Sequence, residues 1–195
     1  MQSEFKNFAL LILTAMAAFS IAGFVMADTA LCRDWNSYSP AHAVGSGDDD
    51  WWTTYPDQHE NSGSVVKHPD WILKALKQKP LLILIHSSNC VPCLTQTPRI
   101  SAAAESFSGD LAYNDILAEG SGYDKAIDIL RVYDPKGVEL KYFVPTTIFI
   151  TLAKGPDGNV DVVWRSEIDA MSPGRIDAFV KDAIYYYKQN SAAWI

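Results

Sequence analysis

The sequence predicts an α/β fold in which a mixed β-sheet is flanked by helices. Helix and strand patterns alternate from residue 65 to the C-terminus. Residues 81–85 are all apolar, which is typical of a central strand covered on both faces. Two β-rich runs, 146–152 and 160–165, flank the turn sequence Gly-Pro-Asp-Gly at 155–158. This arrangement predicts an antiparallel hairpin.

Residues 1–27 are expected to be a signal peptide or an N-terminal membrane anchor. Residues 8–27 carry no charge, and only Thr14 and Ser20 among them are polar. A helix of this length reaches roughly 30 Å, the thickness of the hydrocarbon core of a bilayer. Small or apolar residues just before Asp28 also permit cleavage there. Both interpretations predict an extracytoplasmic protein, either secreted or anchored through residues 8–27.

Residues 28–64 are predicted to form an acidic flexible arm. They contain seven acidic residues and one basic residue. Gly-Ser-Gly at 45–47, followed by three aspartates, has neither a helical nor a strand period. Trp51, Trp52 and Tyr55 are unusual in a linker, and we expect them to pack on the domain edge or to form its first short strand. The domain itself is predicted to comprise residues 65–195 and to fold alone.

The first half of this domain is predicted to contain two helices and two strands. A helix from Asp70 ends before Pro80, because proline cannot continue the backbone hydrogen-bond ladder. The apolar strand follows, and a short loop then leads to a second helix that starts near Cys90. Residues 111–117 form a weaker strand candidate.

The second half is predicted to add a helix, the hairpin and a last helix. Residues 121–133 carry apolar side chains at helical spacing, and Asp-Pro-Lys-Gly at 134–137 ends that helix. After the hairpin, Ser172 is placed to cap the last helix, with Pro173 at its first position.

The overall composition restricts the classes of function. The 195 residues are 48% hydrophobic and 20% charged, so the chain can bury an ordinary core. A net charge of −7 argues against nucleic-acid binding, which needs clustered Lys and Arg. Three cysteines are too few for a disulfide-dense scaffold.

Cys90 and Cys93 lie where the apolar strand passes into the second helix. At a helix N-terminus, free backbone N–H groups and the helix dipole stabilise a thiolate. Such a thiolate can attack a disulfide, and a second cysteine one turn later can resolve the mixed disulfide. A purely structural bond across so short a loop would constrain the unfolded chain very little. A zinc site would need two further ligands. Redox chemistry is therefore the favoured interpretation, and it predicts neither a cofactor nor a metal.

With these motifs, residues 65–195 resemble the thioredoxin superfamily. The quoted motifs are Cys90-Val91-Pro92-Cys93, Pro98 eight residues after the first cysteine, and Val144-Pro145-Thr146 before the hairpin. The resemblance implies a thioredoxin-like fold behind the signal or anchor helix and the acidic linker. It also implies a cis Val144–Pro145 bond facing the cysteines, which exposes the backbone of Val144 to a substrate peptide. Cys90 would be the nucleophile and Cys93 the resolving cysteine.

Two positions depart from the family pattern. Asn89 replaces the tryptophan usual before the first cysteine, and Leu84 replaces a buried acid found in cytosolic thioredoxins. In the family, that acid takes the proton of the second cysteine. Its absence bears on the rate of resolution and on any partnership with a thioredoxin reductase.

His86 lies at the end of the apolar strand, four residues before Cys90. One interpretation is that it tunes the thiol pKa or passes a proton to Cys93. The alternative is a strand-terminal histidine hydrogen-bonded to a loop, and this second interpretation is preferred.

Three functions remain open from the sequence. The leading hypothesis is an extracytoplasmic thiol–disulfide oxidoreductase that exchanges disulfides with protein substrates and depends on a membrane electron donor if it acts as a reductase. The second is a carrier of copper(I), a soft ion suited to the two thiolates and His86. The third is a non-catalytic interaction domain with the same fold. The resemblance favours the first, because in this superfamily a cis-proline beside the cysteines discourages metal binding.

Overall fold

The computed structural model describes residues 34–137 and 141–194. The chain divides into two units, 1–34 and 35–195, and the account below concerns the second. The predicted signal or anchor segment, residues 1–27, lies outside the described residues. Within 34–137 and 141–194, no helix combines the length and the apolar character needed to cross a membrane.

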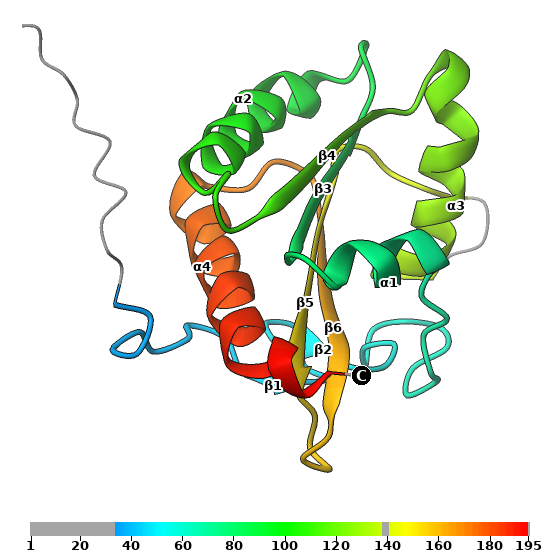
Figure 1. Ribbon diagram of the computed structural model, residues 1–195. Coiled ribbons are helices and arrows are strands. Elements are labelled where there is room, and N and C mark those ends of the chain that lie inside the picture. Colours follow the sequence, from blue (N-terminus) through cyan, green and yellow to red (C-terminus); the bar gives the residue numbers. More distant parts are fainter. Residues whose placement is uncertain (1–33, 138–140, 195) are drawn as a thin grey trace, which may run out of the picture. The chain divides into compact units, whose positions relative to one another are not determined.

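A six-stranded mixed sheet forms the centre of the domain, in the order β1-β2-β6-β5-β3-β4 (Figure 1). The strands are β1 (Val44–Gly45), β2 (Trp51–Trp52), β3 (Leu81–His86), β4 (Ala112–Leu117), β5 (Thr146–Lys154) and β6 (Val160–Ile168). The central strand β3 runs parallel to β4 and antiparallel to β5. Strands β5 and β6 form the predicted antiparallel hairpin, which pairs Thr146 with Ile168 and Lys154 with Val160.

Four helices cover the two faces of this sheet. They are α1 (Asp70–Leu76), α2 (Val91–Ser106), α3 (Tyr123–Tyr133) and α4 (Pro173–Asn190). Helices α2 and α4 lie over one face, and α1 and α3 lie over the other (Figure 1). The last helix begins as predicted, since the Ser172 side chain accepts a hydrogen bond from the backbone N–H of Arg175.

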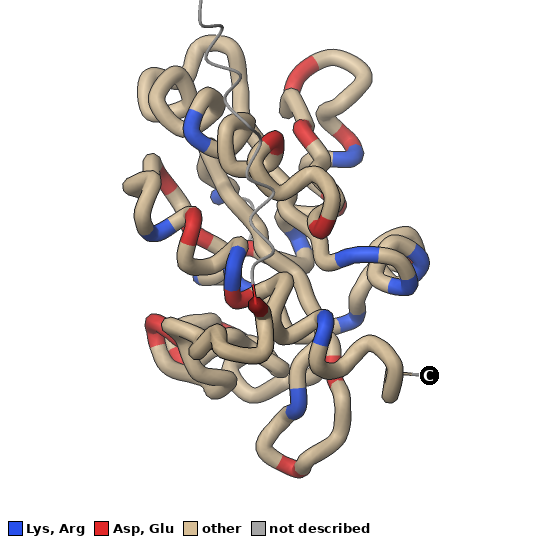
Figure 2. The backbone as a smooth tube through the Cα atoms, turned by 60° about the vertical axis from the view of Figure 1, so that its left-hand side comes forward, with Lys and Arg blue, Asp and Glu red and all other residues tan. Residues whose placement is uncertain are grey.

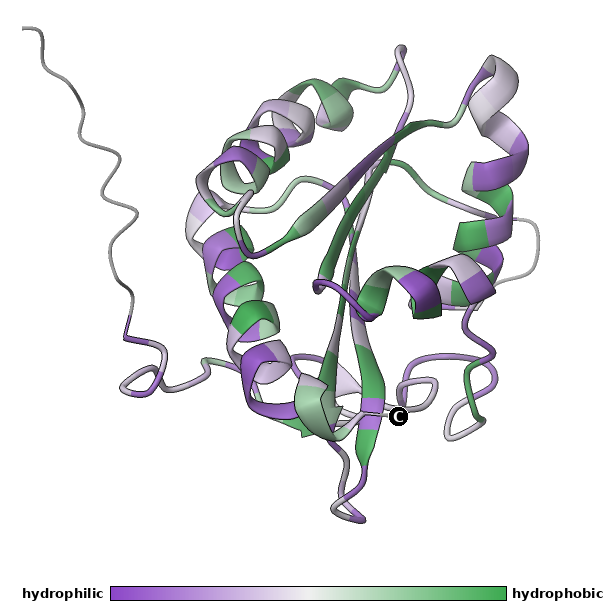
Figure 3. Ribbon diagram, in the orientation of Figure 1, coloured by the Kyte–Doolittle hydropathy of each residue, from purple (hydrophilic) through white to green (hydrophobic). Residues whose placement is uncertain are grey.

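The apolar run in β3 supplies both halves of the core (Figure 3). Side chains alternate along a strand, so Leu82 and Leu84 pack beneath α2 and α4, while Ile83 and Ile85 face α1 and α3. All of these side chains are fully buried. The predicted α/β architecture is confirmed.

The predicted boundary at residue 65 needs correction, because residues 35–64 are part of the same compact unit. Trp51 and Trp52 are 0% exposed and form β2, the short first strand allowed for above. Trp52 pairs with Trp164 on β6. Burial of the two indole rings removes a large apolar surface from water and holds this stretch against the domain. The stretch is therefore not a flexible arm, although aspartates lie next to the tryptophans in the sequence.

The buried carboxylate of Asp182 on α4 binds the first part of residues 35–64 to the domain. It accepts hydrogen bonds from the Tyr38 hydroxyl at 2.6 Å and from the backbone N–H groups of Ala41 at 2.9 Å and His42 at 3.0 Å. The Nδ1 atom of His42 lies 2.7 Å from the same carboxylate, and its ring stacks on Phe179. The segment is thereby attached to a helix far along the chain.

Candidate redox site

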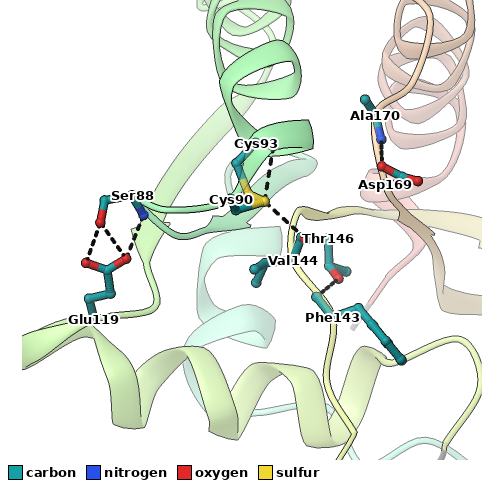
Figure 4. Close-up of a disulfide and its surroundings, with 9 residues drawn as sticks. All are labelled: Ser88, Cys90, Cys93, Glu119, Phe143, Val144, Thr146, Asp169 and Ala170. Atoms are coloured by element: carbon teal, nitrogen blue, oxygen red, sulfur yellow. Dashed lines mark hydrogen bonds between the residues drawn. A yellow bond between two sulfur atoms is a disulfide. The ribbon is translucent and has the colours of Figure 1, made fainter.

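Cys90 and Cys93 form a disulfide at the N-terminus of α2 (Figure 4). Cys90 is the N-cap residue, and its Sγ accepts a hydrogen bond from the Cys93 backbone N–H at 3.1 Å. Cys90 is partly exposed, whereas Cys93 is only 2% exposed. One sulfur is therefore accessible to a partner and the other is shielded. This asymmetry is the one predicted for a nucleophile and a resolving cysteine.

The segment before β5 approaches the disulfide from the opposite side. The Val144–Pro145 peptide bond is cis, and the carbonyl oxygen of Val144 lies 3.3 Å from the Sγ of Cys90. Figure 4 shows this carbonyl directed at the sulfur. The predicted cis isomer is confirmed, and the backbone of Val144 lies beside Cys90.

His86 is directed towards the neighbouring strand. Its Nε2 lies 2.9 Å from the Oδ1 of Asp115 on β4. His86 is thus a strand-terminal histidine with a local partner, as in the preferred interpretation, but the partner lies on a strand and not in a loop. Within the described residues, no group of three or more His, Cys, Asp or Glu side chains is arranged to hold a metal ion.

Glu119 fixes the loop that leads into Cys90. Its carboxylate accepts hydrogen bonds from the backbone N–H of Ser88 at 2.6 Å and from the Ser88 hydroxyl at 2.9 Å (Figure 4). These hydrogen bonds lower the pKa of Glu119 below its usual value. Glu119 was not among the predicted site residues, because nothing local marks an acid that bonds to a loop 31 residues earlier.

A neutral polar pair, Gln96 and Thr147, is buried between α2 and β5. Leu84 is fully buried and pairs with Thr147 of β5. One turn after Cys93, Gln96 is also fully buried and donates from Nε2 to the Thr147 hydroxyl at 2.8 Å. The Oε1 of Gln96 accepts from the Met171 N–H at 2.8 Å. Gln96 therefore joins α2 to β5 and to the segment before α4, and it too was not among the predicted site residues.

Large apolar side chains are exposed around the disulfide. Val91 and Leu94, on either side of Cys93 in α2, are 77% and 70% exposed, and Phe143, next to Val144, is 48% exposed. Exposed apolar surface beside a reactive group is typical of a site that receives another molecule. Basic and acidic residues are interspersed over the described chain (Figure 2).

No known protein family matches the sequence, and no curated protein matches it. Solved structures similar to the chain include three thiol-active proteins. Chloroplastic thioredoxin z is 15% identical, with a TM-score of 0.40 over 60% of this chain and 90% of its own. Mitochondrial thioredoxin 3 from Saccharomyces cerevisiae is 19% identical, with a TM-score of 0.38 over 58% and 87%. A secreted Mycobacterium tuberculosis disulfide oxidoreductase, homologous to E. coli DsbE, is 18% identical, with a TM-score of 0.33 over 55% and 84%.

These similarities are distant, so the fold is recognised from the chain's own topology. The cysteine pair lies between central strand β3 and helix α2, and the cis-proline lies just before β5. Helices α2 and α4 cover one face of the mixed sheet, and α1 and α3 cover the other. The predicted resemblance to the thioredoxin superfamily is therefore confirmed at the level of the fold, and the chain has a thioredoxin-like fold.

Proposed function

We propose that this protein is an extracytoplasmic thiol–disulfide oxidoreductase that exchanges disulfides with protein substrates through Cys90 and Cys93. The observation that carries the proposal is the asymmetry of the pair. The partly exposed Cys90 caps α2 and accepts the Cys93 N–H, while Cys93 is buried behind it. Free N–H groups at a helix N-terminus favour the thiolate, which is the attacking species.

In the reducing direction, the Cys90 thiolate attacks one sulfur of a substrate disulfide. A mixed disulfide forms, the substrate S–S bond breaks, and the leaving thiolate takes a proton from solvent. Cys93 then attacks the Sγ of Cys90, which forms the Cys90–Cys93 bond and releases the second substrate thiol. Two electrons pass from the protein to the substrate. The oxidised protein runs the same steps in reverse, and sustained reduction requires a membrane electron donor.

The backbone of Val144 is placed to receive the substrate chain beside its cysteine. Its carbonyl lies 3.3 Å from the reacting sulfur, and Pro145 fixes the direction of the segment. A substrate segment in an extended conformation would pair with Val144 as an added strand. The exposed side chains of Val91, Leu94 and Phe143 would contact apolar residues of the substrate.

The test is a pair of variants, each of which replaces one of the two cysteines of the site. Cys93→Ser is expected to accumulate mixed disulfides with protein substrates, because the buried resolving thiol is gone. Cys90→Ser is the matched control and should accumulate none. Equal adducts on both variants, or adducts on Cys90→Ser alone, would contradict the assigned roles.

The extracytoplasmic location rests on residues 8–27 and is tested separately. A cysteine-reactive reagent that cannot cross membranes should label Cys90 in intact cells that express the Cys93→Ser variant. Labelling only after lysis would contradict export.

A further inference from the structure

The side chain of Gln96 connects the helix that carries the cysteines to two other segments of the chain. Its Nε2 donates to the Thr147 hydroxyl at 2.8 Å, and its Oε1 accepts from the Met171 N–H at 2.8 Å. All three residues are buried. The amide has one satisfactory orientation, because turning it over would place its NH₂ group against the Met171 N–H, donor against donor.

Two contacts join α2 to the segment that leads into β5. At the first, the carbonyl oxygen of Val144 lies 3.3 Å from the Sγ of Cys90, and at the second, Gln96 bonds to Thr147. From Cys90 to Gln96 the helix advances by about 9 Å along its axis. From Val144 to Thr147 an extended chain advances by about 10 Å. The matching lengths indicate that the two segments run alongside each other, with the Gln96 contact behind the contact at the reactive sulfur.

The segment before α4 closes this connection around the cis-proline. The N–H of Asp169 donates to the carbonyl of Pro145 at 2.9 Å. Two residues later, α2 holds Met171 at both of its backbone groups. Gln96 accepts from the N–H, and the Nη1 of Arg99 donates to the carbonyl at 2.6 Å. Together with the bond to β5, these bonds form a closed circuit through three segments, and Gln96 makes two of its links.

The buried position of Gln96 would be filled equally well by an apolar side chain. The buried residues that follow it on α2, Ile100, Ala103 and Ala104, are all apolar. Apolar burial is non-directional, so it permits neighbouring segments to shift against each other. Hydrogen bonds weaken steeply away from their preferred distance and angle, and a fully satisfied buried network specifies one arrangement. Gln96 therefore fixes how far α2 lies from the segments beside it.

We propose that Gln96 is a positioning residue for disulfide exchange with peptide substrates. Through its two hydrogen bonds it keeps the backbone of Val144 at a fixed place beside the Sγ of Cys90. A peptide that pairs with Val144 then presents its disulfide to that sulfur. The inference rests on the proposed oxidoreductase function and deepens it: the circuit through Gln96 governs reactivity towards disulfides attached to a peptide backbone, and much less so towards small disulfides that have none.

The test compares two disulfides in single turnovers of pre-reduced protein. One is a short unstructured peptide whose central cysteine carries a coloured aromatic thiol as a mixed disulfide. The other is the symmetrical disulfide of the same aromatic thiol, which has no backbone to pair with Val144. In both, the Cys90 thiolate attacks, the disulfide bond breaks and a coloured thiolate leaves, so colour reports the rate. All proteins carry Cys32→Ser, which leaves Cys90 and Cys93 as the only cysteines.

Thr147→Val removes the hydroxyl that Gln96 holds. Thr151→Val is the matched control, because Thr151 is also fully buried on β5 and donates its hydroxyl to the Ala183 carbonyl of α4 at 2.6 Å. Valine favours strands, so both variants should fold, and each loses one buried hydrogen bond. Their urea midpoints should therefore fall by similar amounts.

The measured quantity is the ratio of the rate constant for the peptide to the rate constant for the aromatic disulfide. Thr147→Val should lower this ratio about fivefold, the effect of one hydrogen bond lost between the peptide and the displaced backbone of Val144. Gln96→Met, which loses both bonds of the amide, should lower it at least as far. Thr151→Val should keep the wild-type ratio. A residue with only a structural role would change both rate constants together or neither.

Equal ratios for Thr147→Val and Thr151→Val would overturn the positioning role and leave the oxidoreductase function in place. Failure of the wild type to react with the peptide would overturn that function, and the role of Gln96 with it. Hydrogen exchange of the oxidised proteins gives a second readout that needs no substrate. The Asp169 amide, which bonds to Pro145, should exchange faster in Thr147→Val than in Thr151→Val. Equal exchange at this amide would also overturn the inference.

Discussion

Replacement of Trp51 by alanine should lower the free energy of unfolding by about 3–5 kcal/mol, the usual cost of truncating a fully buried large aromatic side chain. The indole is 0% exposed and makes edge contacts with the rings of Phe149, Phe179 and Tyr186 at centroid distances of 6.4, 5.7 and 6.4 Å. A domain of this size is typically stable by about 5–15 kcal/mol, so the loss would be a large part of the total.

Trp51→Phe is the informative companion variant. The Nε1 of Trp51 is buried without a hydrogen-bond partner among the described residues, so phenylalanine removes an unsatisfied donor and keeps most of the apolar volume. It should cost well under half as much as alanine. Trp71→Ala on α1 is the control, since that ring is only partly buried, and it should cost about 1 kcal/mol.

Urea denaturation of the oxidised protein, followed by far-ultraviolet circular dichroism, measures all three variants. The same assay applies to the fragment 65–195, which the sequence predicts to fold alone. We now expect the fragment to be much less stable than the full chain, because it lacks the buried Trp51 and Trp52. A loss below about 1 kcal/mol for Trp51→Ala, or a fragment as stable as the full chain, would refute the reasoning.

Further outcomes are expected at three other sites. Asp182→Ala should cost about 3 kcal/mol or more, because several buried donors lose their acceptor, and limited proteolysis should then cut within residues 35–50. Burial lowers the pKa of His68 from 6.5 to about 4, so the unfolded chain binds a proton at this residue more readily than the folded protein does. The contribution of this group to the free energy of unfolding is therefore fully present above pH 6.5 and is lost as the pH falls towards 4, by at most about 3 kcal/mol. His68→Gln should flatten that dependence in denaturation curves measured across this range. The Glu119 carboxylate, whose pKa is lowered by Ser88, should hold the loop at neutral pH and release it only at strongly acidic pH. Glu119→Gln should increase hydrogen exchange at the Ser88 amide even at pH 7, and unchanged exchange would exclude the clamp.

Most of the fold could be predicted because its signals are local. The apolar run in β3, the turn between β5 and β6, and Ser172 with Pro173 at the start of α4 each depend on a few adjacent residues. The position of residues 35–64 depends on partners far along the chain. Asp49, assigned to a solvated run, is paired with Arg175 at 2.8 Å, 126 residues later.

The residues of the candidate site also divide into those with a local sequence signal and those that depend on distant partners. Cys90 and Cys93 are marked by their spacing and by the strand before them, and the resemblance supplied the cis-proline. Glu119 and Gln96 act on partners 31 and 51 residues away, so no pattern of neighbouring residues identifies them.

The buried surroundings of Cys93 restrict how its proton leaves during resolution. Leu84 cannot accept a proton, Gln96 and Thr147 are committed to each other, and His86 is held by Asp115. If none of these described groups takes the proton, it would pass to solvent or to the substrate sulfur that departs from Cys90. When Cys93 attacks Cys90, the substrate sulfur leaves as a thiolate close to Cys93. If this thiolate takes the proton of Cys93, proton transfer and resolution of the mixed disulfide both depend on the substrate. In such an arrangement, the acidity of the leaving thiol governs the second step, because a better leaving thiol departs faster. Substrate chemistry would then control how long the mixed disulfide persists.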